Sequence, residues 1–481
     1  MLLHPGSAHA ARTYGQLCEE YESNGNPYAL DDSNPPGGNV YGAYQMSAGN
    51  AVKYAKQLCS KYAVSNPDYA AYGEQLLDAY DKDGEKCSSN FSKAWKAIFP
   101  NQKSAYYQTQ YNYVKSIYYD DAVKKWAAEV DGFKASDKRF SNALRNVIFS
   151  TAVQHGPSGS ASIFSKAMKS IGGYSDSLTE WEIIEAIYAE RSRITTKKAL
   201  RDSGVKGTIY TIAASDYSYN LKHGLISSEQ AVLLKGSCLA HFYQNSGNIQ
   251  AGVYVRLANR EPAAAQELLE SYQAKDYAIT YHLSGGTNNP ANPASHKGGS
   301  SVKLARPERT GYEFKGWFTK AGGKGTQVKS VSGFTTATVY AFWQQVTFSI
   351  GYNPNGGVMP QGCKTEYDVD DKTFKLPEPE RSGYVFLGWY TTKTFKAGTE
   401  MTKVVKGSAQ DLKLYAKWVK GYRAQVNAKG GLTVRAKAST SAAAKGVLKN
   451  KAEVVIVKTS GGWGKLADGG WIKLSYTKKL A

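Results

Sequence analysis

An internal repeat in the second half of the chain constrains the fold more than any other sequence feature. Gly311-Tyr-Glu-Phe-Lys-Gly-Trp-Phe318 returns 72 residues later as Gly383-Tyr-Val-Phe-Leu-Gly-Trp-Tyr390, and both copies end in a similar aromatic run, Tyr340–Trp343 and Tyr415–Trp418. Alternating aromatic positions predict β-strands, because successive side chains of a strand point to opposite faces. Two such copies predict two small β domains in succession, with aromatic side chains that are mostly core.

The two copies resemble the Listeria–Bacteroides repeat, the β-grasp-like B repeat of internalin-type surface proteins. The resemblance runs from Ile279 to about Val419. It implies an extracellular spacer or adhesion role without catalysis. We assign residues 276–346 to the first β repeat and residues 347–420 to the second. Leu283–Ser301, rich in Gly, Pro, Asn and Ser, predicts turns or a linker.

The region before the repeats has a helical pattern. Apolar residues recur at helical spacing in four segments: Asp121–Val130, Leu144–Val153, Glu180–Arg193 and Ser228–Tyr243. Residues 1–275 are therefore predicted to form an α-helical domain, and the 481 residues to form a multidomain chain.

The tail, residues 421–481, predicts five short β-strands. Short β patterns separated by turn residues occur at Leu432–Arg435, Gly446–Leu448, Val454–Val457, Gly462–Leu466 and Gly470–Ile472. Their order resembles a bacterial SH3-type (SH3b) domain, which implies an SH3-like β-barrel that binds peptidoglycan cross-bridges or stem peptides. Trp463 and Trp471 are then predicted wall-binding residues, with ordinary barrel core as the alternative.

Charge supports a wall partner. The tail has 12 Lys or Arg against 2 Asp or Glu, a net +10 out of the chain's +20. Such an excess attracts anionic wall polymers in a salt-dependent way. No nucleic-acid motif accompanies the basic residues, so DNA and RNA are not predicted partners.

Glu22 stands where the first helical pattern stops. Tyr14–Tyr21 reads as an amphipathic helix, and Ser23–Pro27 then opposes helix continuation. A carboxyl group at such a helix end can project into a cleft where apolar neighbours desolvate it. Desolvation raises the pKa of a carboxylic acid, which is the property that a general acid for glycoside cleavage needs.

This stretch resembles the lysozyme-like superfamily, the lytic transglycosylases in particular. Their Glu-Ser-Gly-Gly-Asn-Pro motif is matched by Glu22-Ser-Asn-Gly-Asn-Pro27, and their Gly-Leu-Met-Gln motif loosely by Gly42-Ala-Tyr-Gln45. The resemblance implies that Glu22 is the catalytic acid and that Gln45 lines a sugar cleft. Tyr41 is predicted to help position the glycan.

A second group of candidate residues is Ser150-Thr-Ala-Val-Gln154-His155-Gly156. With Ile187–Arg191 it resembles segments of phage-associated and chitosanase-like hydrolases, which implies that Gln154 and His155 bind sugar hydroxyls. A helix-terminal His bonded to local backbone is the alternative. Glu190 and Arg191 are predicted to form structural ion pairs.

A hydrolase would need a second carboxylate across the sugar. Asp31 and Asp32 are the nearest candidates, and Asp120 and Asp121 are others; for each of them, an ordinary loop or cap role is the alternative. A transglycosylase would need none of them.

Other chemistries lack their signatures. The seven His and five Cys residues form no metal-spaced cluster or CxxC pair, so no metal or cofactor is predicted. Reduced cysteines buried as apolar residues are predicted, with a Cys59–Cys87 disulfide as the alternative. No apolar run reaches the roughly 18 residues of a membrane span. The predicted function is a peptidoglycan glycosidase, muramidase or lytic transglycosylase, secreted or phage-released and acting at the cell wall. The alternatives are a chitosanase-like hydrolase and a non-catalytic surface adhesin.

Overall fold

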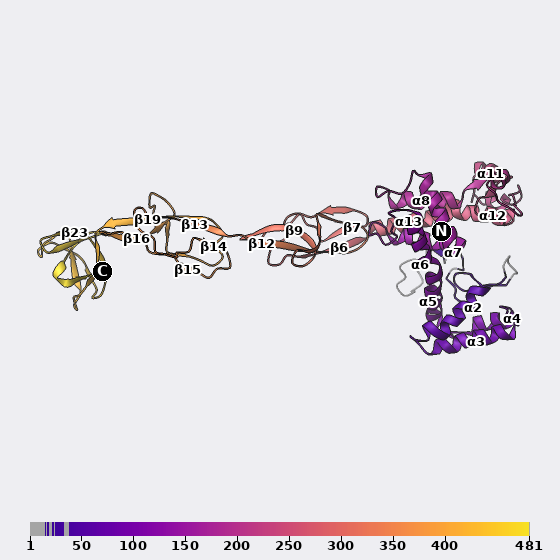
Figure 1. The fold of residues 1–481 in the computed structure, drawn as a ribbon, viewed down its shortest axis with the longest axis horizontal. Helices are drawn as coiled ribbons and strands as arrows, with labels where there is room; N and C mark the ends of the chain where they lie inside the picture. Colours follow the sequence, from indigo (N-terminus) through magenta and orange to yellow (C-terminus); the bar gives the residue numbers. More distant parts are fainter. Residues whose placement is uncertain (1–14, 16, 19–21, 24, 33–37, 481) are drawn as a thin grey trace. The chain divides into compact units, whose positions relative to one another are not determined.

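The computed structural model describes residues 15, 17–18, 22–23, 25–32 and 38–480 (Figure 1). The chain divides into two compact units. Unit 1 comprises residues 1–280, 293–303 and 330–337, and unit 2 comprises residues 281–292, 304–329 and 338–481. The division runs through the first β repeat.

Unit 1 is mainly helical. Three π-helical turns, η1 (Leu58–Tyr62), η2 (Lys115–Tyr119) and η3 (Arg256–Arg260), each join two α-helices. A small sheet of β1 (Leu30–Asp31), β2 (Val40–Tyr41) and β3 (Met46–Ser47) precedes them. The α-helices are α2 (Ala48–Gln57), α3 (Asp68–Lys82), α4 (Ser89–Ala97), α5 (Lys103–Val114), α6 (Asp120–Glu129), α7 (Asn142–Ser170), α8 (Glu180–Arg191), α9 (Lys197–Asp202), α10 (Ser218–Lys222), α11 (Ser228–Leu234), α12 (Gly247–Val255) and α13 (Glu261–Ala274).

Three of the four predicted helices are confirmed, as α6, α7 and α8. The fourth prediction is wrong beyond Leu234, where α11 ends. The chain then turns through Gly236, whose φ of +72° suits glycine, into β5 (Cys238–Leu239), which pairs with β4 (Ile194–Thr195). The apolar residues after Leu234 thus fill a second, smaller core and do not extend the helix.

Part of the first repeat packs onto the helical core. Within unit 1, β6 (Asp276–His282) pairs with β7 (Ser295–Lys297), and β8 (Ser301–Lys303) pairs with β11 (Ser330–Ser332). Phe334 follows β11 and packs against the helical core, and its N–H donates to the Lys138 carbonyl (3.1 Å). Of the two alternatives predicted for Leu283–Ser301, the turns are confirmed and the linker is wrong, because the stretch supplies turns and strands of the repeat itself.

Unit 2 contains the other β strands. β9 (Tyr312–Lys320) pairs antiparallel with β10 (Lys324–Val328) and β12 (Ala337–Gln345). The second repeat forms a sheet in the order β14-β13-β19-β16-β17, in which β13 and β19 are parallel, and a separate pair of β15 and β18. Its strands are β13 (Phe348–Asn353), β14 (Glu366–Tyr367), β15 (Phe374–Lys375), β16 (Tyr384–Tyr390), β17 (Glu400–Met401), β18 (Lys403–Val404) and β19 (Leu412–Lys420).

Tryptophan packing explains why the repeats share their sequence. The Nε1 atoms of Trp343 and Trp418 donate to equivalent backbone carbonyls, both at 2.8 Å. A Cβ atom on Gly286 or Gly357 would lie 2.5 Å from Cζ2 of these rings, so a side chain has no room at either position. The prediction that the aromatic side chains are mostly core is confirmed for the central rings, with Trp317 2% and Trp389 1% exposed, whereas Trp343 and Trp418 are half-buried.

Both repeats also end in the same way. The N–H of Val346, just after β12, donates to the Gly311 carbonyl at 2.9 Å. The N–H of Gly421, just after β19, donates to the Gly383 carbonyl at 3.0 Å. Each repeat thus ties its exit to the glycine turn at the start of its long hairpin.

The tail forms one sheet in the order β22-β21-β25-β24-β23-β20-β26. All five predicted strands are present, and the pattern missed two more, β20 and β26. The strands are β20 (Tyr422–Val426), β21 (Leu432–Arg435), β22 (Ala444–Leu448), β23 (Glu453–Ser460), β24 (Trp463–Leu466), β25 (Trp471–Lys473) and β26 (Thr477–Lys479).

Candidate functional site

Glu22 is helical and a turn begins directly after it at Ser23, as the pattern predicted. Leu17 and Cys18 are helical as well, whereas most of the predicted helix Tyr14–Tyr21 lies outside the described residues. The Glu22 side chain is 20% exposed. Burial raises the pKa of Glu22 above its ordinary value, and the nearby Arg256 guanidinium opposes that rise. A mostly desolvated carboxyl group is thus available at this helix end.

The two segments of the predicted glycosidase motif lie side by side. Ser23 Oγ donates to the Ala43 carbonyl at 2.7 Å. Gln110, fully buried on α5, accepts from the Ala43 N–H at 3.0 Å and donates to the Pro27 carbonyl at 2.9 Å. Gly42 lies between them with φ of +79°, where a Cβ atom would be 2.3 Å from Gln110 Oε1. The loop after Glu22 and the turn before Gln45 are therefore fastened to one another.

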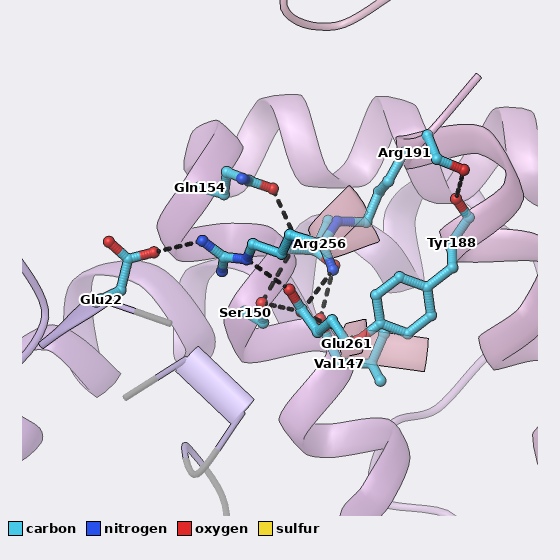
Figure 2. Close-up of polar contacts among 10 residues, drawn as sticks. Glu22, Val147, Ser150, Gln154, Tyr188, Arg191, Arg256 and Glu261 are labelled. Carbon is cyan, nitrogen blue, oxygen red and sulfur yellow. Dashed lines mark hydrogen bonds and ion pairs between the residues drawn. The ribbon is translucent and has the colours of Figure 1, made fainter. Parts of the chain in front are cut away.

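Arg256 connects Glu22 to a second, buried carboxylate (Figure 2). Its Nη1 donates to Glu22 Oε1 at 3.2 Å, and its Nε donates to Glu261 Oε2 at 2.9 Å. Arg256 belongs to η3, and Glu261 begins α13 directly after it. A π-turn inserts an extra residue into a helix and often occurs at functional sites. Here it brings the side chains at i and i+5 together.

Glu261 is the centre of the polar network in Figure 2. Its Oε1 accepts from Arg191 Nη1 at 3.0 Å, from Tyr188 OH at 3.0 Å and from Ser150 Oγ. Burial would raise the pKa of Glu261, but the Arg191 and Arg256 guanidinium groups more than offset it and hold the pKa at about 2. Glu261 is therefore a permanent anion at neutral pH. It partly neutralises the arginine that contacts Glu22.

The predicted residues Gln154 and His155 lie beside this network, at a break in α7. Gly156 has φ of 68° and ψ of 162°, and Pro157 follows it, so the helix is interrupted there. Gln154 Oε1 accepts from Arg191 Nη2 at 2.8 Å. The structure thus gives Gln154 an arginine partner and places it in the same network as Glu22.

His155 Nε2 is buried and has no hydrogen-bond partner among the residues that the structure describes. Its ring packs on Phe242 and His241, with centroids at 5.0 and 5.8 Å. Burial, with the charges of Arg191 and His241, lowers the pKa of His155 to about 2. The ring is therefore neutral at any physiological pH. Glu190 has its own partners, Arg193 Nε at 2.7 Å and His241 Nε2 at 2.9 Å.

Tyr41 lies in the core, although it was predicted to position the glycan. Its ring is fully buried against Phe91 and Trp95, and its hydroxyl donates to the Cys87 carbonyl at 2.8 Å. A ring with no exposed surface cannot contact a sugar in this conformation, so we exclude Tyr41 from the site. Gln45 is half-buried and has φ of 48°.

The candidates for a second carboxylate differ in exposure and in ion pairing. Asp31 is half-buried at the end of β1, and Asp32, directly after it, is exposed. Asp120 pairs with Lys115 Nζ at 2.5 Å, and Asp121 lies 3.9 Å from Lys125 Nζ. These two pairs are ordinary helix-surface ion pairs, which leaves Asp31 and Asp32 as the candidates for a second carboxylate.

The tail tryptophans differ in exposure. Trp463 is 9% exposed, whereas Trp471 is half-buried. Cys59 and Cys87 do not pair: Cys59 Sγ contacts the Ala70 carbonyl and Cys87 Sγ the Ala48 carbonyl.

Two absences apply to the described part of the chain alone. No three His, Cys, Asp or Glu side chains in it gather so as to hold a metal ion. None of its helices combines the length and the apolar character that crossing a bilayer requires.

Sequence comparisons find two families. Residues 14–214 match the family described as type VI secretion system spike protein VgrG3-like, C-terminal, over less than half of the chain. Residues 277–342 and 348–417 match the Listeria–Bacteroides repeat domain, so the chain contains two such repeats, as predicted. The helical region and the repeats thus match unrelated families.

Two proteins of Evansella cellulosilytica are similar to parts of the chain. A putative Gly-rich membrane protein is 31% identical over 159 residues, which cover 31% of this chain and 17% of that protein. A putative membrane protein is 30% identical over 132 residues, covering 26% of this chain and 18% of that protein. The chain spans less than a fifth of either relative.

Two chitosanase structures were also found. A mutant chitosanase from Bacillus subtilis MY002, complexed with 6 GlcN, has a TM-score of 0.27 and 20% identity, covering 39% of this chain and 80% of that one. Chitosanase OU01 with substrate has a TM-score of 0.26 and 18% identity, covering 39% and 85%. Scores this low carry no argument about this chain.

Proposed function

We propose that this protein is a peptidoglycan glycosidase with Glu22 as its general acid. The observation that carries the proposal is the environment of Glu22: a mostly buried carboxyl group with a raised pKa, next to a guanidinium that is itself balanced by a buried carboxylate. A general acid needs a proton near neutral pH and stabilisation of the carboxylate once that proton has left.

The network supplies both needs. In the proposed mechanism Glu22 carries a proton before the reaction; burial favours this form, and Glu261 limits the opposing effect of Arg256. When the proton moves to the glycosidic oxygen, Glu22 becomes an anion 3.2 Å from Arg256 Nη1. The charge pair is then stronger than it was in the ground state, which is the differential stabilisation that lowers a barrier.

The two open candidates for the reaction differ in the need for a base. In a muramidase of the inverting type, Asp31 or Asp32 would activate the attacking water. In a lytic transglycosylase, Glu22 would take back a proton from the 6-hydroxyl of the sugar, and no second carboxylate would act. Gln45, Gln154 and neutral His155 are proposed to contact the glycan.

The modules after the helical domain are proposed to hold the enzyme at the wall. The two repeats would act as a spacer, and the SH3b-like tail, with Trp471 as its more accessible tryptophan, would bind stem or cross-bridge peptides. A second weak contact raises the effective concentration of the enzyme on its substrate. The similarity of residues 14–214 to a secretion-system spike protein is consistent with action outside the producing cell.

Glu22→Gln is the decisive test, in a digestion of purified peptidoglycan with Glu267→Gln, an exposed position on α13, as the matched control. We expect the Glu22 variant to lose about 10²- to 10⁴-fold in rate while the control keeps it. Unchanged digestion by the Glu22 variant would refute the proposal and leave a wall-binding adhesin. Mass spectrometry of the fragments separates the reactions, because anhydro ends indicate a transglycosylase and reducing ends a hydrolase.

A further inference from the structure

A polar cavity lies in unit 1, at the small sheet and the start of α4. It measures about 400 Å³. Its polar lining comes from the β1–β2 hairpin and from one side of α4: Asp32, Asn39, Ser88, Ser92, Lys93 and Lys96. The two lysines are three positions apart, so they lie on the same face of the helix.

Buried contacts hold the floor of this cavity. Tyr41, fully buried beneath it, donates its hydroxyl to the Cys87 carbonyl at 2.8 Å and lies 3.3 Å from Ser92 Oγ. Asn39 Nδ2 donates to the same Cys87 carbonyl at 3.3 Å. The hairpin and the start of α4 are therefore fixed to each other, and the cavity is a built part of the fold.

The two lysines of the cavity have no ionic partner in the described part of the chain. Lys93 and Lys96 are exposed, and neither forms an ion pair with any residue that the structure describes. Asp32 is likewise exposed. Two ammonium groups against one carboxylate give the cavity a net charge of +1, with serine hydroxyl groups between them. Such a lining suits a ligand with a carboxylate group.

The cavity is connected to the proposed active site by the hairpin. Asn39 lines the cavity and leads directly into β2. Beyond β2, the Gly42 N–H donates to the Ala29 carbonyl at 2.8 Å, and the Ala43 carbonyl accepts from Ser23 Oγ. Ser23 directly follows Glu22, so one short stretch of chain leads from the cavity to the neighbour of the proposed acid.

We propose that this cavity binds a free carboxylate of the peptide stem of peptidoglycan. The inference rests on the proposed function and gives it a substrate specificity. In peptidoglycan that carries stems, the lactyl carboxyl of each muramic acid is consumed in the amide bond to the stem, so the free carboxylates lie on the stems. Chitosan carries an ammonium group on each sugar, which the two lysines would repel.

The test compares binding of two soluble ligands by the full chain: a disaccharide with its peptide stem and the same disaccharide without the stem, its lactyl carboxyl capped as a simple amide. Lys93→Gln/Lys96→Gln is the variant, and Lys166→Gln/Lys169→Gln is the matched control, an exposed pair with the same spacing on α7. We expect the first variant to bind the stem-bearing ligand roughly fivefold to tenfold more weakly, since each partly exposed charge pair contributes up to about 1 kcal/mol. The control and the stem-free ligand should show no change, and high salt should remove the difference.

Equal binding of the stem-bearing ligand by wild type and variant would overturn the proposal, as would an equal loss for both ligands or no measurable binding by the wild type. Because the tail is itself proposed to bind stems, both proteins also carry Trp471→Ala, so that the difference reports the cavity. Failure of the proposed function is a separate result: Glu22→Gln would leave digestion intact while the lysine variant still lost stem binding.

Discussion

Removing the buried charge of Glu261 should destabilise the helical unit and move the pH profile of the enzyme. The perturbation is Glu261→Gln, which keeps the shape of the side chain and leaves Arg191, fully buried, without its anion. The fall of the Glu261 pKa from 4.5 to about 2 corresponds to about 3 kcal/mol in favour of the folded state at neutral pH. Loss of one partner of a buried ion pair costs a similar amount, about 3–5 kcal/mol.

The assay is thermal and chemical unfolding from pH 7 down to pH 2, with Glu267→Gln as the control. A loss of about 3 kcal/mol would lower Tm by roughly 5–10 °C. Because the folded-state pKa is depressed, this stabilisation is complete above pH 4.5 and disappears as the pH falls toward about 2, so wild type and variant should converge there. A constant gap across that pH range, or a Tm equal to that of the control, would refute the reasoning.

Activity provides an independent reading of the same variant. Glu261 raises the pKa of Glu22 and Arg256 lowers it, so removing Glu261 leaves Arg256 unopposed. The alkaline limb of the rate profile, where Glu22 loses its proton, should therefore move to lower pH. A limb that stays in place or moves upward would show that Glu261 does not act on Glu22.

Three further outcomes are expected. Gly357→Ala should destabilise the second repeat by about 1–3 kcal/mol, because its Cβ would overlap the Trp418 ring. Gly351→Ala on β13 is the control: its Cβ would meet only the Leu412 carbonyl oxygen, at 3.6 Å, so its free energy of unfolding should be nearly unchanged. The ring of His155 should show no NMR titration between pH 4 and pH 8, since its pKa is about 2, and a midpoint near pH 6 would contradict its buried environment. Phe334→Ala should lower the unfolding free energy of unit 1 by about 2 kcal/mol, and an unchanged value would mean that the repeat does not support the helical core.

Local patterns in the sequence predicted much of the fold. Helical periodicity located α6, α7 and α8, and turn residues separated the five predicted strands of the tail. These features succeed because the signal and the structure both lie within about ten residues. The helix predicted beyond Leu234 was wrong because apolar residues in a buried turn and strand have the same composition as a helix end.

The candidate site was predictable only in part. Glu22 could be found because a helix-ending pattern and a family motif coincide there. Arg256 and Glu261 could not, because their partners Glu22 and Arg191 are distant in sequence, and no local pattern records which charges meet in a core. Tyr41 was assigned to the glycan on its position alone, and its burial against Trp95 has no local signature.

The hydrogen bond that closes each repeat has a consequence for how the number of repeats can change. Val346 and Gly421 occupy the same position, one at the entrance to another repeat and the other at the entrance to the tail. Because the same closing hydrogen bond precedes either a second repeat or the tail, whole repeats can be gained or lost by duplication without changes in the surrounding residues. The number of repeats can thus change in evolution by one copy at a time.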